Sequence, residues 1–288
     1  MGTKTINIFL TGGGWKGSFA GGFLYKLGQW FEQNPGYKVG RVYGSSIGTV
    51  NGSIFLDDYK KLYDFWNEIK SFKSIVDYWC KIPFIGPIIS IIYGFFFKFC
   101  LINPKKFYDL IRKYCSRKNN KLTICTTNLS NAAIEYIDCS NDVDHIDHII
   151  GSCSLWLFSR PINIRDKYYM DGGLIKYLPL NKEIISQYAN DINVVISCAK
   201  NIKRPNNFIL GQNLLFYLDN LIHLICDMLY ENDINEIIKL NNFRCYYLDQ
   251  SLIQNISIQN FKEDDVKKLW NNGIYECTKF IETLYINQ

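Results

Sequence analysis

Short apolar runs alternate with segments of helical periodicity in the N-terminal part of the chain. Positions 6–10 and 39–43 are rich in β-branched and aromatic residues, whereas residues 18–31 carry apolar side chains at intervals of three and four. Short apolar runs bounded by turn residues are typical of strands, and the wider spacing is typical of a helix packed on one face. The sequence therefore predicts strand, helix and strand in succession, followed by a second helix at residues 49–56.

Three more strands follow, and the C-terminal part favours helices. Residues 121–127 and 133–138 flank a turn-rich segment, and residues 192–198 form a continuous apolar run, which is typical of strands buried on both faces. Residues 206–230 and 264–285 show amphipathic helical spacing. Strands that alternate with helices predict an α/β fold with a largely parallel sheet. A chain of 288 residues can bury one large core and carry a helical annex on it.

Residues 82–102 form an apolar stretch close to the length of a membrane span, about 20 residues. Pro83, Gly86 and Pro87 interrupt its start, and Lys98 lies within it. Three interpretations stay open: a buried or site-capping helix, a segment that docks at a membrane interface, and a true span.

Charge and cysteine spacing exclude several kinds of site. The net charge of +5 is mild, and the basic residues are dispersed, so no nucleic-acid partner is expected, whereas weak attraction to anionic lipid fits equally well. Ten cysteines without a CxxC pair argue against a zinc site and a disulfide scaffold. The N-terminus shows no export or lipidation signal. We expect a cytoplasmic protein with reduced thiols and no metal.

Residues 44–48, with the sequence GSSIG, match the GxSxG nucleophile elbow and lie between a strand and a helix. A serine on so sharp a turn is strained, and the positions two before and two after it have no room for a side chain. Ser46 has glycine at both positions, Gly44 and Gly48, whereas Ser45 does not. The motif alone leaves two interpretations, a nucleophile and a glycine-rich turn.

Residues 12–17, with the sequence GGGWKG, also lie between a strand and a helix. Glycines let backbone amides approach a ligand closely, and the following helix N-terminus adds partial positive charge. The amides of Gly12, Gly13 and Gly14 are therefore candidates to bind an oxyanion. Lys16 either favours an anionic substrate or is a solvated lysine at a helix start.

The same six residues also match GxGxxG, the dinucleotide-binding motif. That hypothesis requires an acidic residue about twenty positions on, at the tip of the second strand, to hold the ribose. The second strand ends in Tyr43 and Gly44 instead, and Glu32 falls in the preceding helix. A nucleotide-binding enzyme is therefore a minor alternative.

A serine nucleophile needs a base, for which the chain offers three histidines and one well-placed aspartate. His145 and His148 lie in a polar, Asp-rich stretch, and His223 lies in an apolar helical run, although it alone follows Asp171 in the order Ser, Asp, His. Asp171 ends a strand-like aromatic run and precedes two glycines, which leaves room for close approach. An ordinary Asp-Gly turn is the other interpretation. We favour Asp171 as the base.

Taken in chain order, these three motifs resemble those of the patatin-like phospholipase family, over about residues 6 to 200. The resemblance implies a three-layer α/β/α sandwich and an acyl hydrolase that needs no cofactor, with Ser46 as nucleophile and Asp171 as base. The implied oxyanion hole comprises the amides of Gly12, Gly13, Gly14 and Ile47, and the motif-supporting residues are Lys16, Gly17, Gly44, Gly48, Gly172 and Gly173.

The chain also differs from the family pattern at several positions. Tyr177 stands where many members have asparagine, and Thr11 where many have aspartate. The segment Gly151-Ser152-Cys153-Ser154 is similar to the small-residue segment before the family aspartate, without its usual alanine and proline. The resemblance implies a catalytic domain at residues 1–200, with its core at about 6–180, and a mainly helical region at 201–288 packed on the same domain.

The sequence thus predicts a lipid acyl hydrolase of the phospholipase A or lysophospholipase type. Asp171 would accept the proton of Ser46 during attack on an ester, and water would then cleave the acyl-enzyme. Residues 82–102 would supply the apolar surface for acyl chains, as a lid or within the interface, so peripheral membrane contact is expected. The alternative is a catalytically silent lipid-binding or effector module on the same fold.

Overall fold

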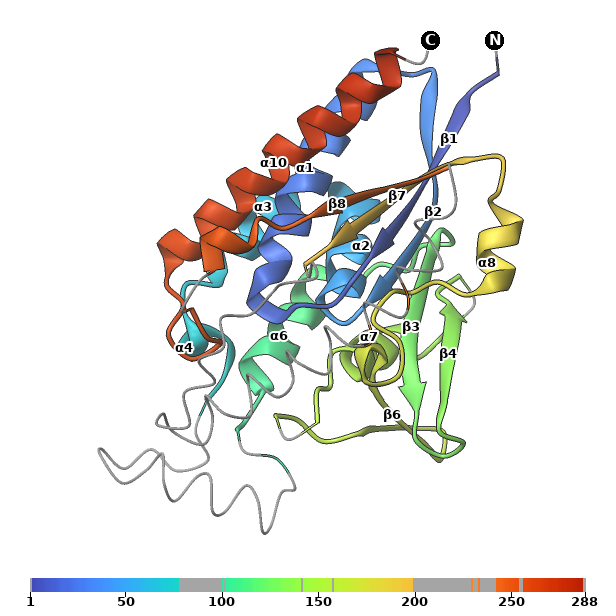
Figure 1. The fold of residues 1–288 in the computed structure, drawn as a ribbon. Coiled ribbons are helices and arrows are strands. Elements are labelled where there is room, and N and C mark those ends of the chain that lie inside the picture. The colour runs from blue at the N-terminus through green and yellow to red at the C-terminus, as the bar shows by residue number, and fades with distance from the viewer. Residues whose placement is uncertain are drawn as a thin grey trace.

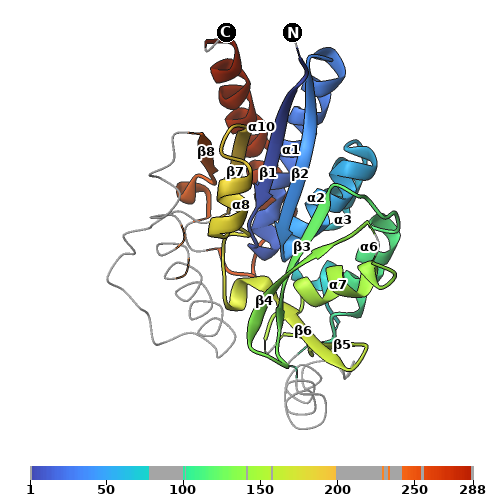
Figure 2. The ribbon, with the colours of Figure 1, turned by 90° about the vertical axis from the view of Figure 1, so that its right-hand side faces the viewer.

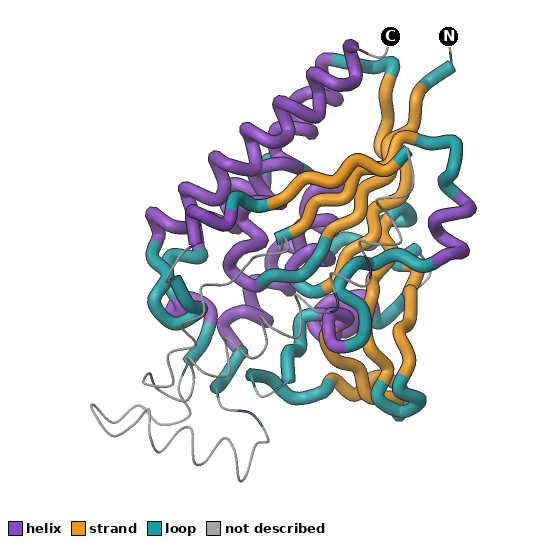
Figure 3. The backbone as a smooth tube through the Cα atoms, viewed as in Figure 1, coloured by secondary structure: helices purple, strands orange, loops and turns teal. Residues whose placement is uncertain are grey.

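The computed structural model describes residues 2–77, 100, 102–140, 142–156, 158–198, 229, 233, 242–253 and 256–286. Within these residues, one eight-stranded sheet has the order β5-β6-β3-β2-β1-β7-β8, with β4 paired to β3 outside this path. Figure 3 shows the strands as one twisted layer with helices on both sides. The two chain ends lie at the same end of the molecule in both ribbon views (Figures 1 and 2).

The sheet has a parallel part and an antiparallel part. The parallel strands are β1 (Lys4–Leu10), β2 (Tyr37–Ser45), β3 (Leu122–Asn128), β7 (Ile192–Ser197) and β8 (Phe243–Tyr247). The antiparallel strands are β4 (Ala133–Asp138), β5 (Ile162–Ile164) and β6 (Lys167–Asp171). The predicted α/β class with a largely parallel sheet is confirmed. Strand β8 was not predicted from the sequence, because it lies in the region that was expected to be mainly helical.

Helices cover both faces of the sheet, as Figures 1 and 2 show from two directions. On one face lie α1 (Ser18–Gln33), α2 (Ile47–Asp58), α3 (Lys61–Glu68) and α10 (Glu263–Ile286), and on the other lies α8 (Lys182–Gln187). The remaining helices in the described part of the chain are α4 (Phe72–Ile75), α6 (Lys105–Tyr114) and α7 (His145–Ser152), and its 3-10 turns are η1 (Gly14–Gly17), η3 (Gly172–Leu174) and η4 (Gln250–Ile253).

Strand β1 separates two apolar cores because successive side chains of a strand point to opposite faces. Ile6, Ile8 and Leu10 pack into the large core beneath α1, α2 and α10, whereas Phe9 packs into the smaller core that includes Ile184 of α8. All four β1 side chains are fully buried. The continuous apolar run of residues 6–10 therefore reflects a central strand covered on both faces.

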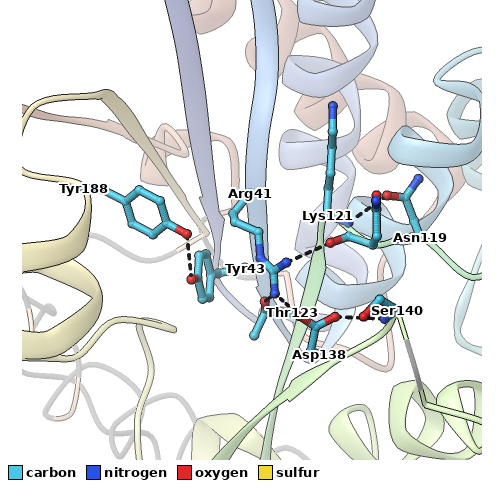
Figure 4. Close-up of polar contacts among 9 residues, drawn as sticks. Arg41, Tyr43, Asn119, Lys121, Thr123, Asp138, Ser140 and Tyr188 are labelled. Atoms are coloured by element: carbon cyan, nitrogen blue, oxygen red, sulfur yellow. Dashed lines mark hydrogen bonds and ion pairs between the residues drawn. The ribbon is translucent and has the colours of Figure 1, made fainter.

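Figure 4 shows how polar contacts of Arg41 on β2 reach β3 and β4. Its guanidinium donates to the Thr123 hydroxyl of β3 at 3.1 Å and pairs with the carboxylate of Asp138 on β4. The same group donates to the carbonyl of Asn120 at 2.8 Å. Desolvation lowers the pKa of Arg41, and the contact with Asp138 more than offsets it, so the pKa lies above its usual value. Arg41 thus anchors β4 beside β3.

Several sequence predictions fall outside the described residues. Of the stretch 82–102, only Cys100 and Ile102 are described, and both are buried. The helix expected at 206–230 and His223 within it also lie outside, apart from position 229. Among the helices that the structure describes, none is both long and apolar enough to cross a membrane.

Candidate active site

Ser46 and Asp171 meet because β2 and β6 approach each other end to end along one edge of β3. Strand β2 runs parallel to β3 and ends with Ser45 opposite Cys125. Strand β6 runs antiparallel to β3 and ends with Asp171 opposite Thr126, the next residue. The ends of two strands that run in opposite directions therefore face each other across one step of β3.

The backbone at Ser46 has the strained geometry of a nucleophile elbow. Its φ of 54° and ψ of −132° are rare for a residue with a side chain. A Cβ on Gly44 would lie 2.4 Å from the Cα of Thr49, and one on Gly48 would lie 2.6 Å from the carbonyl oxygen of Leu10. Both contacts are with backbone, which cannot move aside easily, so the turn requires glycine at both positions.

The carboxylate of Asp171 lies buried beside the Ser46 hydroxyl. It is 4% exposed, and it accepts a hydrogen bond from the amide of Gly173 at 2.8 Å. Desolvation raises the pKa of Asp171 to about 6, although the nearby Ser46 side chain and the Gly173 amide both act in the opposite direction. A carboxylate with a raised pKa is a stronger base, as proton transfer from an alcohol requires.

The glycine loop, residues 12–17, passes close to the nucleophile elbow at residues 44–48. A Cβ on Gly12 would lie 2.9 Å from the Cβ of Ser46, and one on Gly13 would lie 2.6 Å from the Cβ of Cys198. Gly13 and Gly14 also have positive φ angles of 153° and 57°. These conformations and close approaches explain why residues without side chains are needed here.

The end of the glycine loop is anchored to α2. A Cβ on Gly17 would lie 2.6 Å from the side chain of Ile47, and the Gly17 carbonyl accepts a hydrogen bond from Asn51 at 2.9 Å. Asn51 in turn accepts one from the indole of Trp66 at 2.9 Å. Lys16 is 8% exposed, which corrects the interpretation of a solvated lysine at a helix start.

The C-terminal end of α7 supports both members of the Ser46–Asp171 pair. Buried Ser152 accepts a hydrogen bond from the Ser46 amide at 2.9 Å and donates to the Cys125 carbonyl at 2.7 Å. The Ser154 carbonyl accepts from the Asp171 amide at 3.0 Å. Sequence reasoning gave these serines no role, and the small-residue segment at 151–154 was the signal that could have identified them.

Gly172 packs closely against the elbow, whereas the described histidines lie elsewhere. A Cβ on Gly172 would lie 2.6 Å from the Cys125 carbonyl oxygen and 2.8 Å from the Ser45 hydroxyl. His148 instead contacts Asp142, at 2.6 Å, and the ring of Tyr169. The described residues therefore bring an aspartate to Ser46, and neither His145 nor His148 forms a hydrogen bond with it. They also hold no cluster of three or more side chains able to bind a metal ion.

A family model for patatin-like phospholipases matches residues 8–184, which is more than half of the chain. The chain belongs to this family. No curated protein matches the patatin-like chain. Solved structures do match it, among them the crystal structure of VipD from Legionella pneumophila. VipD is 13% identical with a TM-score of 0.48, and the alignment covers 98% of this chain and 67% of that one.

The patatin-like assignment confirms the resemblance that the motifs predicted, and it places the chain among lipid acyl hydrolases. The matched region contains the glycine loop, the elbow and Asp171. The family of this chain is therefore not the dinucleotide-binding one that the GxGxxG match suggested as an alternative.

Proposed function

We propose that this patatin-like protein hydrolyses fatty-acyl esters of phospholipids or lysophospholipids through Ser46 and Asp171. The position of the buried Asp171 carboxylate beside the strained Ser46 carries the proposal. Such a pair has a nucleophile held at a strand end and a base next to it, which is the minimum that acyl transfer requires.

The proposed reaction has two steps. Asp171 takes the proton of the Ser46 hydroxyl as its oxygen attacks the ester carbonyl carbon, and the negative oxygen that develops is bound by the amides of Gly13, Gly14 and Ile47. The leaving alcohol departs with the proton from Asp171 and leaves an acyl-serine. Water then attacks the acyl group, Asp171 again takes and returns the proton, and the fatty acid leaves.

Several features of the site support these roles. Removal of one oxyanion donor costs roughly 100- to 1,000-fold in rate in related chemistry, so a weak carboxylate base can suffice when the amides are held in place. The first amides of a helix have no hydrogen-bond partner inside that helix. Gly14 begins η1 and Ile47 begins α2, so the helices themselves leave both amides available to an oxyanion.

The lipid substrate and a peripheral contact with membranes, in part through residues 82–102, belong to the same proposal.

The test is labelling with a fluorophosphonate probe combined with fatty-acid release from phosphatidylcholine and phosphatidylglycerol vesicles. Ser46→Ala should abolish labelling and lower hydrolysis by at least about 1,000-fold, and Asp171→Asn should lower it by a similar factor. Ser45→Ala is the matched control, because Ser45 is the adjacent buried serine and its hydroxyl has no hydrogen-bond partner among the described residues.

The outcomes separate the two hypotheses for this fold. Labelling and hydrolysis that survive Ser46→Ala would contradict the assigned nucleophile. A folded wild-type protein that binds lipid vesicles but is neither labelled nor active would favour the catalytically silent lipid-binding module. Loss of activity on His223→Ala, with folding retained, would contradict Asp171 as the only base.

A further inference from the structure

The carbonyl oxygen of Gly12 accepts hydrogen bonds from two hydroxyl groups. Thr11 donates from the end of β1 at 3.1 Å, and Tyr177 donates at 3.1 Å from the segment that follows Asp171. Both residues are buried, with exposures of 0% and 4%.

Fixing this carbonyl also fixes the direction of the next amide. The peptide bond between Gly12 and Gly13 is planar and trans, so its C=O and N–H point in opposite directions. Gly12 lies against Ser46, so this amide belongs to a peptide close to the nucleophile. A peptide between two glycines rotates more freely than any other, and a donor that rotates cannot be preorganised.

Other contacts hold both residues in place. The Thr11 oxygen accepts a hydrogen bond from the Cys198 amide at 3.0 Å, which ties it to the end of β7. The residues on either side of Tyr177 are held by Asp233, whose carboxylate accepts from the Leu178 amide at 3.0 Å and lies 3.5 Å from the ammonium of Lys176. The Gly12 carbonyl is therefore held between two anchored hydroxyls.

We propose that Tyr177 and Thr11 are positioning residues that orient the Gly13 amide for oxyanion binding by holding the Gly12 carbonyl. This inference rests on the proposed hydrolase function. If it is correct, the Tyr177 hydroxyl stabilises the transition state, in which the oxyanion forms, and contributes little to binding of the uncharged ester.

The first test compares Tyr177→Phe with wild type in hydrolysis of a soluble p-nitrophenyl ester. The variant keeps the ring and loses the hydroxyl, so kcat should fall about tenfold while KM changes less than twofold. The rate of Ser46 labelling by a fluorophosphonate should fall by a similar factor. Tyr188→Phe is the matched control, because its hydroxyl lies in the same small core and contacts Tyr43 at 3.2 Å.

A second measurement separates positioning from a merely structural role. A trifluoromethyl ketone forms a negatively charged adduct with a serine nucleophile, whereas an uncleavable ether analogue of the ester does not. In Tyr177→Phe the ketone should bind about tenfold more weakly and the ether unchanged. Equal weakening of both ligands, or an unchanged kcat, would overturn the proposal.

Thr11 provides an independent pair of variants in case Tyr177→Phe does not fold. Thr11→Ser retains the hydroxyl and should keep kcat within twofold of wild type, whereas Thr11→Val should lose about tenfold with KM retained. Equal kcat values for the two would overturn the proposal. If the wild type itself is not labelled at Ser46, the proposed function and this inference both fall. If labelling persists at the same rate in every variant, this inference alone falls.

Discussion

At the scale of single residues, the site combines groups that the folded chain holds at a cost. Ser46 has a strained backbone, and the Asp171 carboxylate is almost completely removed from water. Such costs are common where a site must be arranged before the substrate arrives, and the remainder of the fold supplies the compensating stability. Replacing these residues should therefore separate stability from activity.

Asp171→Asn should make the protein more stable at pH 7 while abolishing hydrolysis. Burial raises the pKa of Asp171 from 3.8 to about 6, so the folded state holds this proton more tightly than the unfolded state. Stability from this group is present below pH 4 and is lost as the pH rises to about 6, a difference of about 3 kcal/mol. Asparagine has no such ionisation, so the gain should be present at pH 7 and absent near pH 4.

Urea unfolding of wild type and Asp171→Asn at these two pH values measures the effect. Asp142→Asn is a control for the general loss of a carboxylate, because Asp142 lies on the turn before α7 and pairs with His148. A variant that is no more stable than wild type at pH 7 would show that the Asp171 carboxylate is not destabilised by burial.

The sequence predicted those residues whose chemistry or steric need is local. Ser46 was identified because an elbow needs glycine two positions away on each side, and Asp171 because two glycines follow a strand-like run. Ser152 and Tyr177 were not given these roles, since their hydroxyls act on peptide groups 106 and 165 positions away in the chain. No periodicity or motif encodes such contacts.

At the scale of elements, the contact between α1 and α10 depends on glycine. A Cβ on Gly273 would lie 1.9 Å from the carbonyl oxygen of Phe19, and one on Gly22 would lie 2.1 Å from that of Trp270. The two helices therefore touch backbone to backbone. Ser18 adds a hydrogen bond to the carbonyl of Val266 at 2.7 Å across the same contact.

Gly273→Ala should destabilise the protein by about 3 kcal/mol, because the added methyl group must push two backbones apart. Gly36→Ala is the matched control, since a Cβ at this turn position meets nothing within 4 Å. Urea unfolding at neutral pH measures both variants. Equal stabilities would mean that the helices can separate without loss of packing.

The sequence predicted the central elements well and the edge of the sheet poorly. Residues 18–31 and 264–285 have strong helical spacing and became α1 and α10. Strand β8 was missed because its five residues, FRCYY, form a strand only by pairing with β7 and carry no alternation that distinguishes them. Pairing partners distant in sequence decide such short strands.

At the scale of the whole molecule, the C-terminal part completes the core. Strand β8 pairs along β7, and α10 covers α1, where Phe280 and Phe23 have ring centroids 6.0 Å apart. A division of the chain near residue 200 would therefore expose one sheet edge and one apolar helix face.

A fragment of residues 1–200 should fail to fold cooperatively. Exposed strand edges and large apolar surfaces favour aggregation over a stable monomer. Thermal unfolding followed by circular dichroism should show a sharp transition for the full chain and none for the fragment. A fragment that melts cooperatively and is labelled at Ser46 would show instead that residues 201–288 are dispensable for the fold.

The meeting of β2 and β6 on β3 has a consequence for the cell that makes this protein. A slip of one residue in the pairing of β6 would move Asp171 by about 3.3 Å and turn it to the opposite face of the sheet. In the proposed mechanism, a chain in which β6 is not yet paired in this register therefore has Ser46 without its base and cannot hydrolyse esters. The proposed activity therefore appears only after β6 has paired with β3 in the correct register.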